Sequence, residues 1–304
     1  MRSLNASRRQ GTAPNPRAQD RGAQHRKPAI SRRHVRGIGG LLGLSILVIA
    51  GCASTGSDPE HLARVHGLDS AWVQGEGFRH RVFRHGADNG PLHVYLEGDG
   101  RPWLTRRQVN TDPTPRTALA LRLMLRDAAP GLYLGRPCYH GSASDRGCSP
   151  WLWTHGRYSE AVIASMAAAL HRIAGVDRTL TLIGYSGGGT IAMLLAPRLS
   201  NVARVITVAA NLDTAAWTRH HGFSPLTGSM NPADMEPLPG HIAQLHLAGG
   251  RDRNVPPRLS AITAARQPGT GLRVIPNYDH RCCWERDWTT LISPNPASVP
   301  AHEP

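Results

Sequence analysis

The sequence predicts an α/β fold in which helices flank a mostly parallel central sheet. Short apolar segments of strand length alternate with helical segments, as they do where crossover helices connect parallel strands. Apolar residues make up 40% of the chain and charged residues 18%, a balance that excludes a wholly disordered protein. Only one apolar run approaches the length of a membrane span, which excludes a multi-helix membrane protein. We therefore expect one folded domain of roughly 230–250 residues.

The expected strands are short, apolar and partly β-branched, and several end at turn residues. They are residues 79–84, 91–97, 131–135, 179–183, 202–209, 245–248 and 272–275. The first alternates weakly between polar and apolar residues, which is typical of an exposed strand. The others are apolar enough to lie inside a sheet that is covered on both faces.

Three segments between these strands have helical character. Residues 117–129 are amphipathic, with leucines at alternate positions. Residues 160–174 follow Ser159, a residue type that often caps a helix N-terminus. Residues 190–199 are almost entirely apolar, which indicates a buried helix.

Composition divides the chain into four parts. Residues 1–51 are a basic leader, and residues 52–75 are a polar linker. The folded domain is expected to span residues 76–291, and residues 292–304 are a Pro-rich tail that we expect to be loose.

The leader carries much of the positive charge. The whole chain has 35 Lys and Arg against 21 Asp and Glu, a net charge of +14. Ten of the basic residues lie within residues 1–51, together with a single acid, Asp20. A basic tail is one signature of nucleic-acid binding. A cleaved leader explains the same charge more simply, so no nucleic-acid partner is expected.

Residues 37–51 form an uncharged apolar stretch directly before a cysteine. A bilayer-spanning helix needs about 20 residues, whereas the apolar core of a signal peptide needs about 7–15. The sequence Ile49-Ala50-Gly51-Cys52 resembles the lipobox of bacterial lipoproteins, which implies cleavage before Cys52 and acylation of its thiol. Ala53 replaces the Asp of the inner-membrane retention signal, so we expect a lipid anchor in the cell envelope, on the periplasmic face of the outer membrane.

The strongest chemical motif is Gly184-Tyr185-Ser186-Gly187-Gly188, between the expected strand 179–183 and the apolar helix 190–199. A nucleophile on a sharp strand-to-helix turn needs small neighbours, because the backbone there is strained and closely packed. The helix N-terminus also favours a developing negative charge. A glycine-rich turn without catalysis is the alternative, but this context predicts that Ser186 is a nucleophile.

In these features the chain resembles the α/β-hydrolase family over about residues 79–291, and the resemblance implies a Ser–acid–His order of catalytic residues. The turn from Gly249 to Pro256 is similar to the family's Gly-x-x-Asp-x-x-Val-Pro turn, which makes Asp252 the predicted acid. Asp213, after strand 202–209, is the alternative acid. His280 follows the last expected strand and is the predicted base.

An oxyanion hole requires two backbone N–H groups directed at the developing alkoxide. Gly187, directly after the nucleophile, is the first expected donor. The second is expected from Glu97-Gly98-Asp99-Gly100, where many esterases of the family have His-Gly instead. Asp99 is the predicted donor and Gly98 the alternative, against a plain tight turn.

With Cys52 acylated, four cysteines remain, and an oxidising periplasm permits disulfides between them. Four cysteines allow three connectivities. Cys138 and Cys148 can close a short loop and leave Cys282 and Cys283 as a vicinal pair or two thiols, or crossed pairs can join two distant loops. No CxxC or HExxH spacing supports a metal site, and the predicted chemistry requires no metal or cofactor.

The predicted function is hydrolysis of a small acyl ester, or of a lipid or polymer ester, by a membrane-anchored serine hydrolase. An acyltransferase or a peptidase with the same three residues, and a non-catalytic binding lipoprotein, are the alternatives. Residues 211–241 look loop-like, enough for a small lid and too short for a large cap domain. Aromatic residues near the cysteines can either line a cleft or anchor loops; they are Trp151, Trp153, Tyr158 and Trp284.

Overall fold

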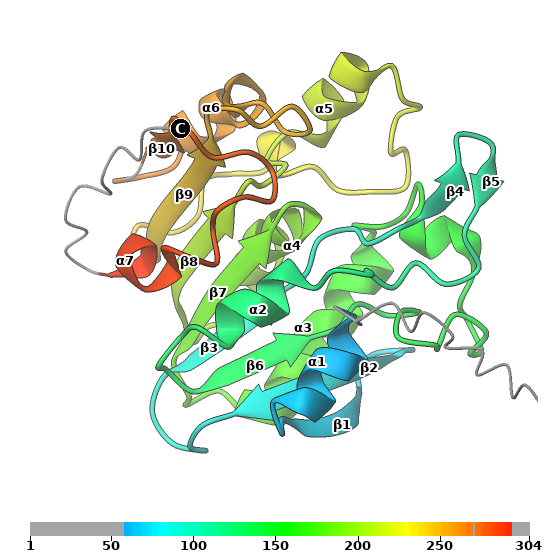
Figure 1. The fold of residues 1–304 in the computed structure, drawn as a ribbon, viewed down its shortest axis with the longest axis vertical. Coiled ribbons are helices and arrows are strands. Elements are labelled where there is room, and N and C mark those ends of the chain that lie inside the picture. The colour runs from blue at the N-terminus through cyan, green and yellow to red at the C-terminus, as the bar shows by residue number, and fades with distance from the viewer. Residues whose placement is uncertain (1–57, 270, 294–304) are drawn as a thin grey trace, which may run out of the picture. The chain divides into compact units, whose positions relative to one another are not determined.

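A computed structural model describes residues 58–269 and 271–293, which contain an eight-stranded mixed sheet (Figure 1). The strand order is β1-β2-β6-β3-β7-β8-β9-β10. β2 is antiparallel to both of its neighbours, and every other neighbouring pair is parallel. The strands are β1 (Asp69–Gln74), β2 (Arg79–His85), β3 (Leu92–Leu96), β6 (Gly131–Leu134), β7 (Leu180–Tyr185), β8 (Val202–Val208), β9 (Ala243–Gly249) and β10 (Leu272–Ile275).

Helices cover both faces of this sheet (Figure 1). Successive strand residues point to opposite faces, so Val94 and Tyr95 of β3 belong to two different buried clusters. The cluster around Val94 packs against α3 (Glu160–Ala174), α4 (Gly187–Leu195) and α6 (Pro257–Ala265). The cluster around Tyr95 packs against α1 (Pro59–Val65), α2 (Leu119–Met124) and α7 (Trp288–Ile292). The prediction of a mostly parallel sheet flanked by helices is confirmed.

Residues 52–75 are predicted to be a linker, but the described part of this segment, residues 58–75, contains a helix and a strand, which corrects that expectation. Pro59 opens α1, and the side chain of Asp58 caps the helix by accepting the N–H of His61 at 2.9 Å. β1 then pairs with β2 along its whole length. All residues of β1 are exposed or half-buried, so the strand has no apolar pattern in the sequence.

The predicted helices exist; α3 has the predicted bounds, while the ends of the other two differ from expectation. α2 is shorter than the amphipathic segment 117–129, and α4 begins at Gly187, before the predicted start. Ser159 does occupy the N-cap position of α3, yet its side chain makes no capping hydrogen bond. After α4 a short 3₁₀ turn, η2 (Ala196–Arg198), contains Pro197, which cannot continue the helix.

The region 211–241 is not merely a loop. It contains α5 (Thr214–His221), which Asp213 caps and Gly222 ends at a φ of 62°, and the 3₁₀ turn η3 (Pro232–Asp234). The sequence also gave no indication of the hairpin formed by β4 (Trp103–Thr105) and β5 (Gln108–Val109), or of η1 (Pro150–Trp153).

Two disulfides are present, Cys138–Cys148 and Cys282–Cys283, so the crossed connectivities are not adopted. The predicted acylation site, Cys52, and the Pro-rich tail from residue 294 lie outside the described residues. In the described part of the chain, no helix is both long and apolar enough to cross a membrane.

Candidate active site

The candidate residues lie at one edge of the sheet. Asp99 follows β3, Ser186 follows β7, Asp252 follows β9 and His280 follows β10. These four strands are parallel. Because the carboxyl ends of parallel strands meet at one edge, residues far apart in sequence converge there, where α/β proteins commonly bind ligands.

Ser186 occupies a sharp turn between β7 and α4. Its φ of 52° and ψ of −121° lie in a region that residues other than glycine rarely adopt. A Cβ at Gly184 would collide with the carbonyl of Gly188, so the turn needs a glycine there. The turn places Ser186 at the N-terminus of α4, where unpaired backbone N–H groups favour negative charge.

Ser186, His280 and Asp252 form one hydrogen-bonded chain. Nε2 of His280 lies 3.1 Å from Oγ of Ser186, and Nδ1 of His280 lies 2.8 Å from Oδ2 of Asp252. The side chain of Asp252 is fully buried, while 17% of the His280 side chain is exposed. A carboxylate facing Nδ1 favours the tautomer with its proton on Nδ1, which leaves Nε2 free to accept a proton from Ser186.

The alternative acid, Asp213, has a different environment. Its Oδ1 accepts the N–H of Ala216 at 2.9 Å and lies 3.3 Å from Nδ2 of Asn231. Asp213 is therefore a helix cap of α5, and the carboxylate that faces His280 is that of Asp252.

Asn254, which the sequence did not single out, contacts the same imidazole. Its Nδ2 lies 2.9 Å from Nε2 of His280. Its backbone carbonyl accepts hydrogen bonds from Trp217 Nε1 at 2.9 Å and His221 Nε2 at 2.7 Å, both on α5. Asn254 thus connects the helix beside the site to the candidate base. The only sequence signal was its place two residues after Asp252.

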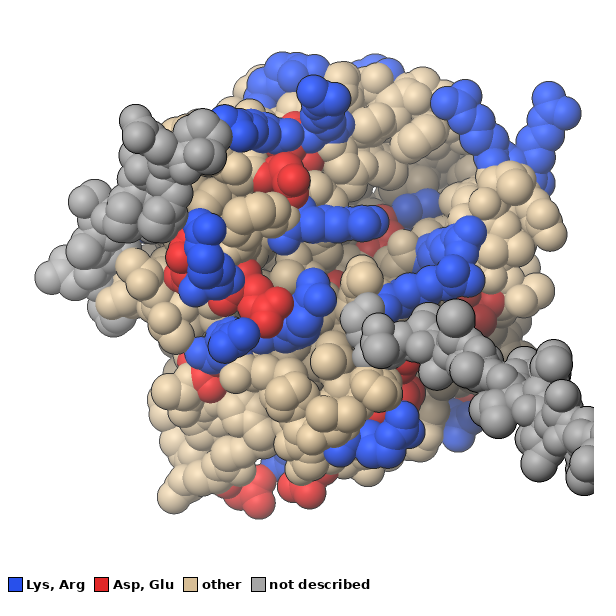
Figure 2. All heavy atoms as spheres, viewed as in Figure 1, with Lys and Arg blue, Asp and Glu red and all other residues tan. Residues whose placement is uncertain are grey.

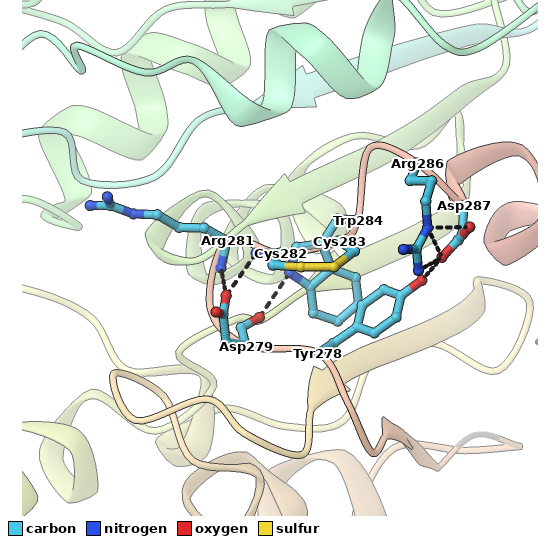
Figure 3. The surroundings of a disulfide bond; sticks show 8 residues. All are labelled: Tyr278, Asp279, Arg281, Cys282, Cys283, Trp284, Arg286 and Asp287. Atoms are coloured by element: carbon cyan, nitrogen blue, oxygen red, sulfur yellow. Dashed lines mark hydrogen bonds and ion pairs between the residues drawn. A yellow bond between two sulfur atoms is a disulfide. The ribbon is translucent and has the colours of Figure 1, made fainter. Parts of the chain in front are cut away.

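The loop that carries His280 is held by its own hydrogen bonds (Figure 3). Oδ1 of Asp279 accepts the backbone N–H groups of Cys282 and Arg281, at 2.7 Å each. The bond from Cys282 above all lowers the pKa of the Asp279 carboxyl. The buried Trp284 donates its Nε1–H to the Asp279 carbonyl at 3.1 Å, beside the Cys282–Cys283 disulfide.

The two predicted oxyanion donors, Gly187 and Asp99, lie against each other. A Cβ at Gly187 would overlap Oδ1 of Asp99, so only glycine fits beside that carboxylate. Neither backbone N–H has a hydrogen-bond acceptor among the described residues. The N–H of the alternative donor, Gly98, is already donated to Oε1 of Glu97 at 3.0 Å.

Asp99 is held by four buried side chains, three of them at its carboxylate. Arg157 Nη1 and Arg136 Nη2 lie 2.8 and 2.9 Å from its oxygens, and the Tyr158 hydroxyl donates to them at 2.8 Å. The Tyr139 hydroxyl donates to the Asp99 carbonyl at 3.0 Å. Burial alone would raise the pKa of Asp99, but the charges of Arg157 and Arg136 outweigh it and lower that pKa. Two buried cations and one carboxylate leave net positive charge beneath this loop.

Glu97 supports the same loop from the other side. Its carboxyl accepts the N–H groups of Gly98 and Ala120, each at 3.0 Å, and the second of these joins the loop to the start of α2. Burial raises the pKa of Glu97 to about 7, against the lowering effect of those two hydrogen bonds.

A pocket of about 910 Å³ opens at this edge of the sheet, and Ser186, Gly187, Asp99 and His280 all line it. The pocket also has aromatic walls, contributed by Trp103, Tyr185, Trp217 and Phe223. These are not the aromatic residues that the sequence suggested for a cleft.

Those residues, Trp151, Trp153, Tyr158 and Trp284, lie outside the pocket lining. Three of the four are buried, and Trp153 donates its Nε1–H to the carbonyl of Asn110 at 3.0 Å. The three buried ones therefore anchor loops, while Trp151 is 45% exposed. Within residues 58–269 and 271–293, no group of three or more His, Cys, Asp or Glu side chains is arranged to hold a metal ion.

Comparison with solved structures identifies the fold. A putative hydrolase from Agrobacterium vitis S4 superposes with a TM-score of 0.51 at 15% identity, over 74% of this chain and 96% of that one. The Pyrococcus furiosus esterase Pf2001 gives a TM-score of 0.52 at 14% identity, over 73% and 88%. A serine hydrolase from Cycloclasticus zankles gives 0.51 at 11% identity, over 74% and 95%. No protein-family model and no curated protein matches the sequence.

These similarities show that the chain has the α/β-hydrolase fold, as the sequence predicted. The segment between β8 and β9 adds only α5 and η3 to this fold, beside the pocket.

Proposed function

We propose that the protein is a serine hydrolase that cleaves carboxylic esters, with Ser186 as nucleophile, His280 as general base and Asp252 as the acid that orients the base. The observation that carries the proposal is the hydrogen-bonded chain from Asp252 through His280 to a serine on a strained turn. A serine hydroxyl is a weak nucleophile unless an adjacent base takes its proton, and this chain supplies that base.

In acylation, Nε2 of His280 takes the proton of Ser186 as Oγ attacks the acyl carbonyl. Asp252 keeps Nδ1 protonated and stabilises the imidazolium that forms. The tetrahedral intermediate then collapses, and His280 gives its proton to the departing alkoxide. The products of this half-reaction are the free alcohol and an acyl ester on Ser186.

The backbone N–H groups of Gly187 and Asp99 bind the developing oxyanion. Two observations support this role: among the described residues neither N–H has another acceptor, and Asp99, Arg136 and Arg157 together carry net positive charge behind the loop. In deacylation, His280 activates a water molecule that attacks the acyl carbonyl, and Ser186 leaves with the proton.

The pocket volume and its aromatic walls suit an acyl ester of small to moderate size, free or on a lipid. We also propose that an acylated Cys52 anchors this domain to the cell envelope, because of the lipobox-like sequence before it. The Cys52→Ala variant should then move from the detergent phase to the aqueous phase in detergent partitioning, and an unchanged distribution would refute the anchor.

Hydrolysis of p-nitrophenyl butyrate tests the proposed activity. Ser186→Ala and His280→Ala should each lower kcat by at least about 10³-fold, since the members of such a triad act as a unit. Ser70→Ala, on the exposed strand β1, is the matched control and should keep the wild-type rate. A Ser186→Ala variant with undiminished hydrolysis would contradict the proposal, and a folded wild-type protein without hydrolysis would favour a binding protein.

A further inference from the structure

The pocket in front of Ser186 has an excess of positive charge. Five arginines line it against two carboxylates, Glu97 and Asp99. Glu97 is buried, Asp99 is half-buried, and both are already bound: Asp99 by Arg136 and Arg157, and Glu97 by two backbone N–H groups. Neither is therefore available to neutralise the arginines at the mouth of the pocket.

Three of these arginines have free guanidinium groups. Arg101, Arg106 and Arg281 make no side-chain hydrogen bond or ion pair with any residue that the structure describes. Outside the pocket, some arginines have acidic partners, for example Arg79 with Asp145 and Arg126 with Glu285, while others, such as Arg172 and Arg253, have no side-chain partner among the described residues. Three of the five arginines that line the pocket are thus unpaired among the described residues, and they lie around one opening.

The three arginines reach the pocket from separate segments. Arg101 lies on the loop after β3, and Arg106 lies in the turn of the β4–β5 hairpin. Arg281 directly follows His280. In Figure 3 the Arg281 side chain extends away from Asp279, which binds only its backbone N–H. Figure 2 shows arginine atoms bordering the hollow between α5 and the β4–β5 hairpin.

The pocket also has an apolar wall beside these cations. This wall consists of Trp103, Leu104, Phe223 and Leu226. Of these, Leu104 is 38% exposed and Phe223 is 48% exposed. A fitting ligand therefore has an apolar part and an anionic group. Guanidinium groups pair with carboxylate and phosphate oxygens in bidentate geometry. A cleft with low-dielectric walls also focuses the field of its charges and raises the local concentration of anionic ligands.

We propose that Arg101, Arg106 and Arg281 form a cationic rim that selects anionic amphiphilic esters, which carry a carboxylate or phosphate away from the scissile ester bond. This inference rests on the proposed function and names its substrate class. The anionic group stays outside the reaction, and the rim arginines bind it while Ser186 attacks the acyl carbonyl.

A pair of soluble esters tests the rim. The p-nitrophenyl monoester of suberic acid carries a free carboxylate too far from the scissile ester to attack it, and its methyl ester replaces that carboxylate with a neutral group. The value of kcat/KM is measured for each ester with the full-length protein. The ratio of kcat/KM for the charged ester to that for the neutral ester should exceed the corresponding ratio of their alkaline hydrolysis rates. This ratio of kcat/KM values should fall as the salt concentration rises. Arg106→Gln and Arg281→Gln should each lower this ratio by about fivefold to tenfold, the effect of one partly exposed charge-assisted hydrogen bond.

Arg107→Gln is the matched control, because Arg107 adjoins Arg106 in the hairpin turn but does not line the pocket. Its ratio should equal that of the wild type. A wild-type ratio without preference, or one that Arg106→Gln and Arg281→Gln leave unchanged, overturns the rim and leaves the esterase proposal standing.

Binding to the Ser186→Ala variant separates the two proposals. This variant should bind the suberic monoester more tightly than its methyl ester, and equal affinities overturn the rim whatever the hydrolysis assay gives. Tighter binding of the charged ester, with no hydrolysis of either by the wild type, supports the rim and overturns the esterase function.

Vesicles identify the source of the anionic group. The protein is given phosphatidylglycerol vesicles and phosphatidylcholine vesicles with the same acyl chains. If it releases acyl chains faster from phosphatidylglycerol, and Arg106→Gln loses this preference, the rim binds lipid headgroups. If the preference for the charged substrate is seen only with the soluble esters, the rim binds the anionic group of small acids.

Discussion

Nδ1 of His280 lies 2.8 Å from Oδ2 of Asp252, whose side chain is fully buried, while the carboxylate of Asp213 caps α5 instead. Asp252→Asn should therefore lower kcat by about 10⁴-fold, because an amide in that place favours the wrong imidazole tautomer. Asp213→Asn is the control and should keep the wild-type kcat, since Asn caps helices as well as Asp. Steady-state ester hydrolysis by the two variants checks this, and the reverse pattern would make Asp213 the acid.

The buried ion pairs of Asp99 predict a large loss of stability when they are broken. Asp99→Asn leaves Arg136 and Arg157 without a carboxylate, which should lower the free energy of unfolding by about 3–5 kcal/mol. Glu160→Gln breaks the exposed pair between Glu160 and Arg198 and should cost less than about 1 kcal/mol. Urea unfolding of both variants measures the difference, and equal costs would show that the Asp99 pairs are not structurally important.

Glu97 predicts a specific pH dependence of stability. Burial raises its pKa from 4.5 to about 7 in the folded state, so the folded protein binds this proton more tightly than the unfolded chain does. Stability from this group is fully present below pH 4.5 and is lost as the pH rises through about 7, by about 3 kcal/mol in total.

The Glu97→Gln variant removes this titration. The free energy of unfolding is measured in urea from pH 4.5 to 8 for the variant and for the wild type. The value for the variant minus the value for the wild type should increase with pH. His80 and His246, whose pKa values burial lowers to about 4, titrate in both proteins and cancel in the difference. A pH-independent difference between the two proteins would contradict the raised pKa of Glu97.

The two disulfides predict unequal effects on stability. Cys138 and Cys148 close a loop with a sequence separation of 10, so replacing both with Ser should lower the free energy of unfolding by about 2–3 kcal/mol through loop entropy. Cys282 and Cys283 are adjacent and close no such loop, so replacing both with Ser should lower the free energy of unfolding by less. Thermal unfolding of both variants checks the order, and an equal or smaller loss for Cys138 and Cys148 would contradict it.

The sequence predicted the parallel sheet well because each buried strand is a contiguous apolar run, and it located Ser186 because the elbow is a local motif. It missed α1 and β1 because β1 has no buried side and therefore no apolar pattern. It also missed the support of the oxyanion loop. Asp99, Arg136 and Arg157 are far apart in the chain, and nothing local marks a charged residue as buried and paired.

Asn254, in the candidate active site, likewise could not be predicted from local sequence. Its contact with His280 joins two turns that are 26 residues apart, and only the folded sheet edge brings those turns together. The cationic rim likewise depends on which arginines lack an acidic partner in space, whereas the sequence indicates only that the chain is basic.

The central claim is that Ser186 is an activated nucleophile. Labelling with a fluorophosphonate probe tests it most directly, with the full-length protein in detergent and intact-mass detection of the adduct. We predict one adduct per chain on Ser186, absent from the Ser186→Ala variant and strongly reduced in His280→Ala. A folded wild-type protein that takes up no probe, or a Ser186→Ala variant labelled as fast as wild type, would contradict the claim.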